Sequence, residues 1–201
     1  MRRKSAQTRM EIPPPISDGA SLGKVQVVIN KGGPEAIQVF IEMLKRSDPP
    51  SKRTAAWALA KMRSRNPEAV PLLIPMLKDH WMDWEAASAL SAIGPEAKAA
   101  VPDLIALLKR RTGLPGYYAA RALGNIGPDA KAALPALREA MKSRNSLVQL
   151  GACLAVYKLD PQSKEEVVPI LADIYRARPP SPWGMEAIRE MAPELLQSKN
   201  R

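Results

Sequence analysis

The sequence predicts an all-α protein that stacks helix–turn–helix units along one axis. Two observations carry this prediction. The stretch AIGPEAKAAVPDLIALLK, from Ala92 to Lys109, recurs 33 residues later as NIGPDAKAALPALREAMK, and ten of the eighteen residues are identical. Both copies also belong to units with two blocks of apolar residues at helical spacing, separated by a Gly-Pro pair that stops the first helix. A hairpin of this size cannot bury its own apolar face, so neighbouring hairpins must stack into one core.

The repeat divides the chain into units. Residues 1–19 contain several cations and a run of prolines, and we expect them to form a flexible tail. Residues 20–198 are predicted to be a single solenoid. Its units are an N-terminal capping unit at 20–47, repeats at 50–80, 81–113, 114–145 and 146–179, and a C-terminal capping unit at 180–198.

Each repeat carries its own start and stop signals. Gly94 and Gly127, each followed by proline, are expected to end the first helix of their repeats. A second proline, at positions 71, 102 and 135, fits only the first turn of the second helix, where a missing N–H costs little. These signals predict a hairpin with the turn between the two prolines.

Composition agrees with a compact helical protein. The chain has 201 residues, of which 46% are hydrophobic, 25% charged and only 4% aromatic. Its longest uncharged run, from Asn145 to Tyr157, is too short to cross a bilayer. No apolar segment follows the basic N-terminus as in a signal peptide. We therefore expect a protein without membrane insertion, with the cytoplasm as its default location.

The repeat pattern AAxALxxIGPxAKxAxPxLxxxxK resembles HEAT repeats, in the short form also found in phycobilin-lyase-type proteins. The resemblance is strong over 50–178 and weak over 20–47 and 180–198. It implies a right-handed, armadillo-like α-solenoid with the first helices on the convex face and the second helices on the concave face. Because this fold carries many functions, the repeat alone assigns none.

Comparison between repeats separates structural residues from candidate functional ones. Cys153 aligns with alanines in three other repeats, which predicts a buried structural thiol. His80 lies in an inter-repeat turn and is expected to be exposed. Trp81 and Trp84 align with large apolar residues, which predicts packing between repeats. Trp57 aligns with variable residues and is a candidate aromatic contact. With one histidine and one cysteine, we expect neither a metal site nor a cofactor.

Positive charge is the main functional signal, because the formal net charge is +10 and is spread along the chain. Cations near the ends of the second helices are predicted to stack into a basic ridge, since equivalent positions of successive repeats lie about 10 Å apart per helix layer. A second set, near the starts of the second helices, would extend it. The ridge comprises Arg46, Lys78, Lys109, Arg110, Arg111, Lys142, Arg144 and Arg176, together with Lys98, Lys131 and Lys164.

These observations predict a non-catalytic, monomeric scaffold that binds a partner protein with an acidic surface through its concave face and basic ridge. The alternative is nucleic-acid binding through the same ridge. Trp81, Glu85 and Arg121 loosely resemble the residues of alkylpurine DNA glycosylases, a HEAT-like family, although the acid differs in type. The resemblance to phycobilin-lyase-type repeats implies a chromophore-lyase role as a further alternative.

Overall fold

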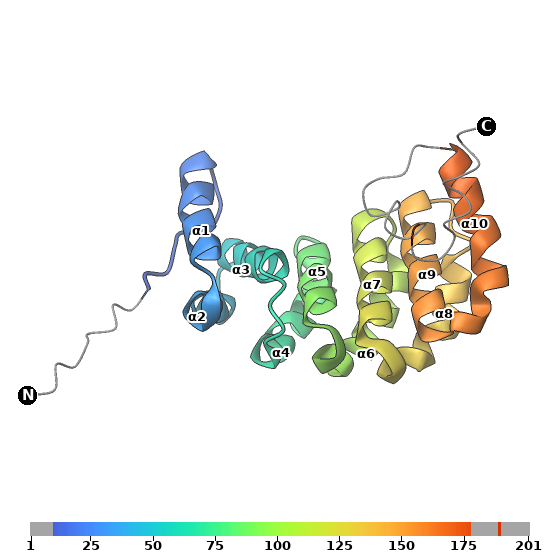
Figure 1. The fold of residues 1–201 in the computed structure, drawn as a ribbon. Coiled ribbons are helices and arrows are strands. Elements are labelled where there is room, and N and C mark those ends of the chain that lie inside the picture. The colour runs from blue at the N-terminus through green and yellow to red at the C-terminus, as the bar shows by residue number, and fades with distance from the viewer. Residues whose placement is uncertain (1–9, 178–188, 190–201) are drawn as a thin grey trace, which may run out of the picture.

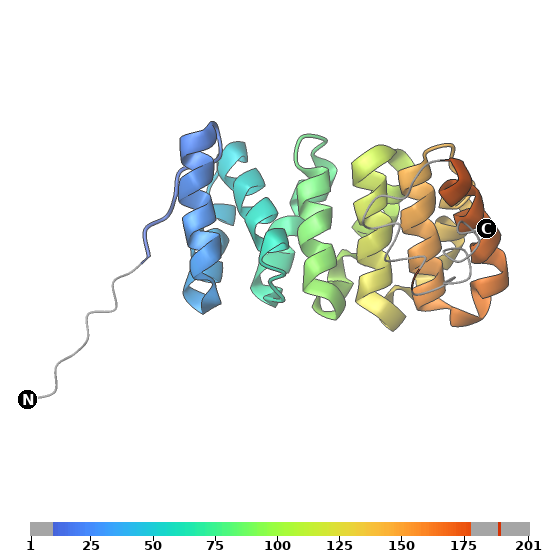
Figure 2. The ribbon, with the colours of Figure 1, turned by 45° about the horizontal axis from the view of Figure 1, so that its top comes forward.

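The computed structural model describes residues 10–177 and 189, and every regular element in that part of the chain is helical. The first helices of successive hairpins lie in one layer, and Figure 2 shows them side by side. Their partners α2, α4, α6 and α8 lie in a second layer beneath them (Figure 1). The first helices are α1 (Gly19–Lys31), α3 (Pro49–Lys61), α5 (Asp83–Ile93), α7 (Gly113–Ile126) and α9 (Ser146–Leu159). The second helices are α2 (Gly33–Leu44), α4 (Val70–Leu73), α6 (Val101–Arg110), α8 (Leu134–Ala140) and α10 (Lys164–Ala177). This arrangement confirms the predicted all-α solenoid.

The helix signals of the sequence lie where they were predicted, with one difference. Gly94 and Gly127 end α5 and α7 with φ of 79° and 80°, a left-handed conformation that favours glycine. The prolines at 71, 102 and 135 occupy the second position of α4, α6 and α8. The difference is in the connections between the two helices of a hairpin, which were expected to be short turns. Gly94–Ala100 and Gly127–Ala133 instead each form a 3-10 helix of seven residues. Shorter 3-10 segments flank α4, at Pro67–Ala69 and Ile74–Lys78, and precede α10, at Pro161–Ser163.

Small residues let the first helices approach one another closely. Ala86, Ala119 and Ala152 occupy equivalent positions and are fully buried. At Gly124, a Cβ would lie 2.8 Å from the Cα of Ala155, so α7 and α9 meet backbone to backbone. Cys153 is also buried, as predicted, and burial raises the pKa of its thiol to about 12. Its packing position and raised pKa both describe a structural residue.

The described part of the predicted tail lies against the first repeats. Asp18 caps α1 through a reciprocal pair of bonds, in which the Ser21 backbone N–H donates to the Asp18 carboxylate at 2.7 Å and the Asp18 N–H donates to the Ser21 hydroxyl at 3.0 Å. The backbone N–H of Ile16 donates to Thr54 Oγ1 on α3 at 2.9 Å. Met10 and Ile16 pack against the core. Residues 1–9, and the predicted C-terminal capping unit except Arg189, lie outside the described residues.

No helix within residues 10–177 is both long enough and apolar enough to span a bilayer.

The close contact of α7 with α9 predicts the effect of Gly124→Ala. The added methyl group has to push the two helices apart, so we expect the free energy of unfolding to fall by about 1–3 kcal/mol. Gly23→Ala on α1 is the matched control, because a Cβ there meets nothing within 4 Å. It should raise the free energy of unfolding by up to about 1 kcal/mol through helix propensity alone. Urea denaturation followed by circular dichroism measures both, and equal effects would contradict the close-contact interpretation.

Candidate functional site

Most cations of the predicted ridge are exposed, but several of them hold the protein's own structure together. Lys78 Nζ lies 3.4 Å from Asp103 of the next repeat, and Arg110 Nη2 donates to the Leu77 carbonyl oxygen. The half-buried Arg111 pairs through Nε with the buried Asp83 at 3.1 Å. Two more members pair locally: Lys142 with Glu139 at 2.9 Å, and Arg176 with Asp173 at 3.1 Å. Within the described residues, the ridge members without such a bond are Arg46, Lys98, Lys109, Lys131, Arg144 and Lys164.

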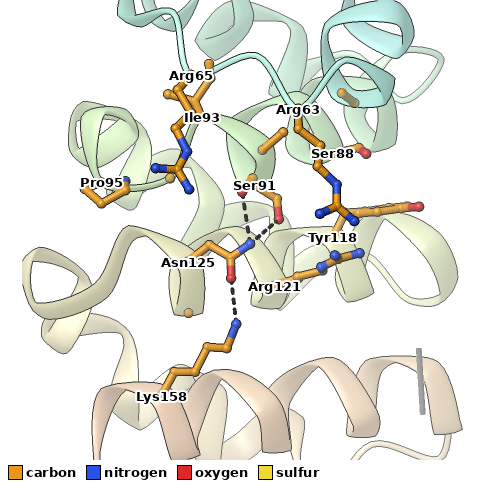
Figure 3. Close-up of a pocket in the computed structure, with 14 residues that line it drawn as sticks. Arg63, Arg65, Ser88, Ser91, Ile93, Pro95, Tyr118, Arg121, Asn125 and Lys158 are labelled. Atoms are coloured by element: carbon orange, nitrogen blue, oxygen red, sulfur yellow. Dashed lines mark hydrogen bonds between the residues drawn. The ribbon is translucent and has the colours of Figure 1, made fainter. Parts of the chain in front are cut away.

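A pocket of about 580 Å³ lies elsewhere, on the layer of first helices. Its polar lining comes from the loop after α3 and from α5, α7 and α9 (Figure 3). We call this pocket the basic groove. Its polar lining residues are Arg63, Arg65, Ser88, Ser91, Tyr118, Arg121, Asn125 and Lys158. The resemblance to HEAT repeats assigns the first helices to the convex face, so the groove is not on the face where partner binding was expected.

A hydrogen-bonded ladder fixes one side of the groove. Asn125 on α7 donates through Nδ2 to the carbonyl oxygen and the hydroxyl of Ser91 on α5, both at 2.9 Å. Its Oδ1 accepts from Lys158 Nζ on α9 at 2.9 Å. The three residues come from three successive repeats, as Figure 3 shows. The ladder therefore ties these repeats together and holds an ammonium group at the groove.

The backbone of Arg63 is unusual, because it is the one residue other than glycine with a positive φ, 49°, among those described. It follows α3 in a hydrogen-bonded helix ending, with Arg63 N–H donating to the Ala60 carbonyl at 3.1 Å and Ser64 N–H to the Leu59 carbonyl at 3.0 Å. The next two repeats place Gly94 and Gly127 at this position. An L-residue here costs roughly 1–2 kcal/mol in backbone energy. Arginine has thus replaced glycine where the backbone favours glycine.

The groove concentrates positive charge without acidic partners. Figure 3 shows the guanidinium groups of Arg63 and Arg121 pointing toward each other. No carboxylate oxygen of the described residues lies within 4.0 Å of the cationic groups of Arg63, Arg65, Arg121 or Lys158. Four other arginines within the described ranges do have carboxylate partners: Arg53, Arg111, Arg138 and Arg176. The groove is therefore an electropositive site suited to an anion.

Two buried carboxylates flank the start of α5. Glu85 is bound by Arg53 at 2.8 Å and has a side chain only 3% exposed, and Asp83 is fully buried beside Arg111. Burial raises the pKa of both groups, and their arginines partly oppose this rise. Because Glu85 is enclosed by the fold, its carboxylate cannot reach a nucleobase in the way the glycosylase resemblance implies. No group of three His, Cys, Asp or Glu residues that could hold a metal occurs in the described part of the chain.

The aromatic residues differ from the predictions in one case. The expectation that Trp81 packs between repeats is wrong, because this residue is 67% exposed in the turn before α5. Trp84 is half-buried with its ring centroid 6.0 Å from that of Tyr118, which confirms packing between repeats. Trp57 is half-buried against the core, and Lys61 Nζ lies 5.7 Å from its ring centroid. Trp57 lies outside the lining of the basic groove and stays only a candidate contact.

Sequence analysis missed Arg63, Arg65 and Lys158, and it noted Arg121 only in the glycosylase-like set. A signal for Arg63 was present, since alignment of the repeats places arginine against two glycines. Nothing in the sequence indicated that Arg65 and Lys158 would line the same pocket. Their proximity depends on how three repeats stack.

The left-handed backbone of Arg63 predicts that Arg63→Gly stabilises the protein. We expect the free energy of unfolding to rise by about 1 kcal/mol, because glycine adopts this conformation without the Cβ clash. The comparison variant is Gly94→Arg, which should lower the free energy of unfolding by more than this amount, because Gly94 is buried and its φ of 79° with ψ of −133° is a conformation essentially restricted to glycine. Thermal and urea denaturation measure both variants. A destabilised Arg63→Gly variant would show that the arginine side chain makes a net stabilising contribution.

The buried carboxylates predict a specific pH dependence. Their pKa values are raised, so the native state binds more protons than the unfolded state above about pH 4, and the free energy of unfolding falls as pH rises through this range. Glu85→Gln should therefore lose stability relative to the wild type at pH 4 and recover part of that loss by pH 7. Urea denaturation between these pH values tests this, with the surface variant Glu96→Gln controlling for the loss of one charge. A difference that widens toward neutral pH would mean that the Arg53 pair outweighs burial.

Comparison with known proteins places the chain in a family. A family model described as HEAT repeats matches residues 22–81, 37–114 and 116–192. No curated protein matches at a significant level. Among solved structures, the complex of CpcE and CpcF of phycocyanin lyase from Nostoc sp. PCC7120 is similar, with 28% identity, a TM-score of 0.62, and coverage of 81% of this chain and 70% of that chain.

Two further solved structures, one engineered and one designed, show the same fold at lower identity. An engineered protein has 21% identity and a TM-score of 0.56, with coverage of 90% of this chain and 92% of that chain. A designed armadillo repeat protein in complex with the peptide (KR)4 has 19% identity and a TM-score of 0.59, covering 89% and 91%. The family match spans most of the sequence and agrees with the stacked hairpins of the structure. The chain belongs to the HEAT-repeat family.

Proposed function

We propose that this protein is a non-catalytic binding module that holds a partner protein through the basic groove. The observation that carries the proposal is the set of four cations in one pocket without a carboxylate neighbour among the described residues. Side chains of the same charge repel one another in the free protein, so an anionic partner gains from every cation it contacts. The partner's bound segment is therefore acidic.

Features of the groove favour a protein segment over a nucleic acid. Its polar lining mixes guanidinium groups with hydroxyl and amide groups at Ser88, Ser91 and Asn125, which suits short side chains and peptide groups. Tyr118 is the only aromatic residue that lines it within the described chain, so it offers no platform for stacking successive bases. The similarity to the complex of CpcE and CpcF, which joins two proteins, is consistent with a protein partner.

A non-catalytic role agrees with the burial of the chain's potentially reactive side chains. The Cys153 thiol is buried with a raised pKa, and Asp83 and Glu85 are enclosed with their arginine partners. None of these groups lines the basic groove. A substrate in the groove would meet cations and neutral polar groups, which bind and orient an anion but supply no general base at neutral pH.

The proposal predicts that charge reversal in the groove abolishes binding to an acidic peptide. A fluorescein-labelled poly-glutamate peptide serves as the probe in fluorescence anisotropy. The variant Arg63→Glu/Arg65→Glu/Arg121→Glu should bind at least about tenfold more weakly, because three charge-assisted contacts become repulsive. The variant Lys109→Glu/Lys131→Glu/Arg144→Glu on the predicted ridge changes the net charge equally and should weaken binding by less than about threefold through long-range charge alone.

Other outcomes of this experiment separate the alternatives. A larger loss of peptide affinity in the ridge variant than in the groove variant would place the binding site on the ridge. Binding through the ridge stays a prediction until this is measured. A duplex DNA probe that binds more tightly than the peptide, with affinity falling steeply as salt rises, would favour the nucleic-acid alternative. Glutamine versions of the groove variant replace the glutamate versions if circular dichroism shows that the latter are unfolded.

A further inference from the structure

The two facing guanidinium groups of the basic groove indicate which kind of anionic group the partner carries. The overall positive charge of the groove indicates only that the partner is acidic. Arg63 comes from the loop after α3, and Arg121 from the middle of α7, more than a turn before that helix ends at Ile126. A cation in the last turn of a helix is stabilised by the helix dipole, but Arg121 lies outside that turn. Neither the dipole nor an acidic neighbour accounts for its presence beside Arg63.

Arg63 is held at this place despite the preference of its backbone for glycine. The repeats that follow have Gly94 and Gly127, both with positive φ, at the aligned position. Its side chain points into the groove toward Arg121 (Figure 3). A strained residue that also places its charge beside a like charge indicates a functional constraint on that side chain.

The charge and donor geometry of the pair match a phosphate better than a carboxylate. Two guanidinium groups carry two positive charges and offer two planar forks of N–H donors. A carboxylate carries one negative charge and is satisfied by one fork. A phosphate monoester carries about −1.5 to −2 at pH 7 and has three acceptor oxygens, so it neutralises both arginines and accepts from both forks. The hydroxyl group of Ser88 lines the same pocket and supplies a further donor.

We propose that Arg63 and Arg121 form a phosphate site, and that the partner's segment carries a phosphorylated serine, threonine or tyrosine beside acidic residues. This inference rests on the proposed function of the groove. Arg65 and Lys158 line the remainder of the groove and bind the flanking acidic side chains. The Asn125 ladder fixes the position of Lys158, so that part of the site is already organised before the partner binds.

The test compares three labelled peptides that differ at one residue within a row of glutamates: phosphoserine, glutamate or serine. The 201-residue chain should bind the phosphoserine peptide at least about tenfold more tightly than the glutamate peptide, because the second fork finds a partner only in the phosphate. Arg63→Gly and Arg121→Gln should each reduce this preference to within about threefold, since either substitution leaves a single fork. Lys24→Gln on α1, outside the groove, is the control and should keep the preference.

Each remaining result has one meaning. Equal affinity for the phosphoserine and glutamate peptides, lost in the groove charge-reversal variant, overturns the phosphate site and leaves the proposed function standing. A phosphoserine preference that survives both Arg63→Gly and Arg121→Gln places the phosphate elsewhere and also overturns the inference. Failure of all three peptides to bind overturns the proposed function with it. Binding of duplex DNA alone, lost in Arg121→Gln, assigns the pair to a nucleic-acid backbone instead.

Discussion

Close contact between consecutive first helices is the constraint on which this structure depends. A single hairpin exposes too much apolar surface to fold alone, so each repeat relies on its neighbours for a core. Buried alanines at equivalent positions, and Gly124 against Ala155, allow the first helices to approach backbone to backbone. These positions admit only small residues, so larger polar side chains lie on the outward face of the same helices. The basic groove lies on that face.

Polar contacts between repeats then set the register of the stack. The Asn125 ladder joins α5, α7 and α9, and Arg53 of α3 pairs with the buried Glu85 of α5. Arg110 also donates to the Leu77 carbonyl oxygen of the preceding repeat. Such bonds add less net stability than apolar burial, but an unpaired buried carboxylate is costly, so the pairs favour one alignment over others. This explains why part of the cationic ridge serves the fold. A cation at a recurring position of a solenoid can either bond to a neighbouring repeat or bind another molecule. Its contacts in the structure distinguish the two roles.

The fold could be predicted from the sequence, and the site could not, for physical reasons. Helix endings depend on local residues such as Gly94 and Pro102, whose conformational preferences are visible in the chain itself. The groove depends on the relative placement of Arg63, Arg121 and Lys158, which only the packing of three repeats determines. Trp81 shows the limit of comparison between repeats. It aligns with Leu147, which packs against the core, and with Leu114, which is exposed as Trp81 is, so a large apolar residue at this position does not establish burial.

Two energetic penalties coincide at Arg63: a left-handed backbone without glycine, and a like charge facing it from Arg121. In the free protein both oppose the folded state, and the left-handed backbone alone costs roughly 1–2 kcal/mol. An anion between the guanidinium groups turns the second penalty into a favourable interaction without altering the first. Occupancy of the groove must therefore stabilise the stack of α3, α5 and α7, since a ligand that binds only the native state raises its stability. Binding and folding are linked through this pair, and the strain at Arg63 is tolerable because the rest of the solenoid is held by its apolar core.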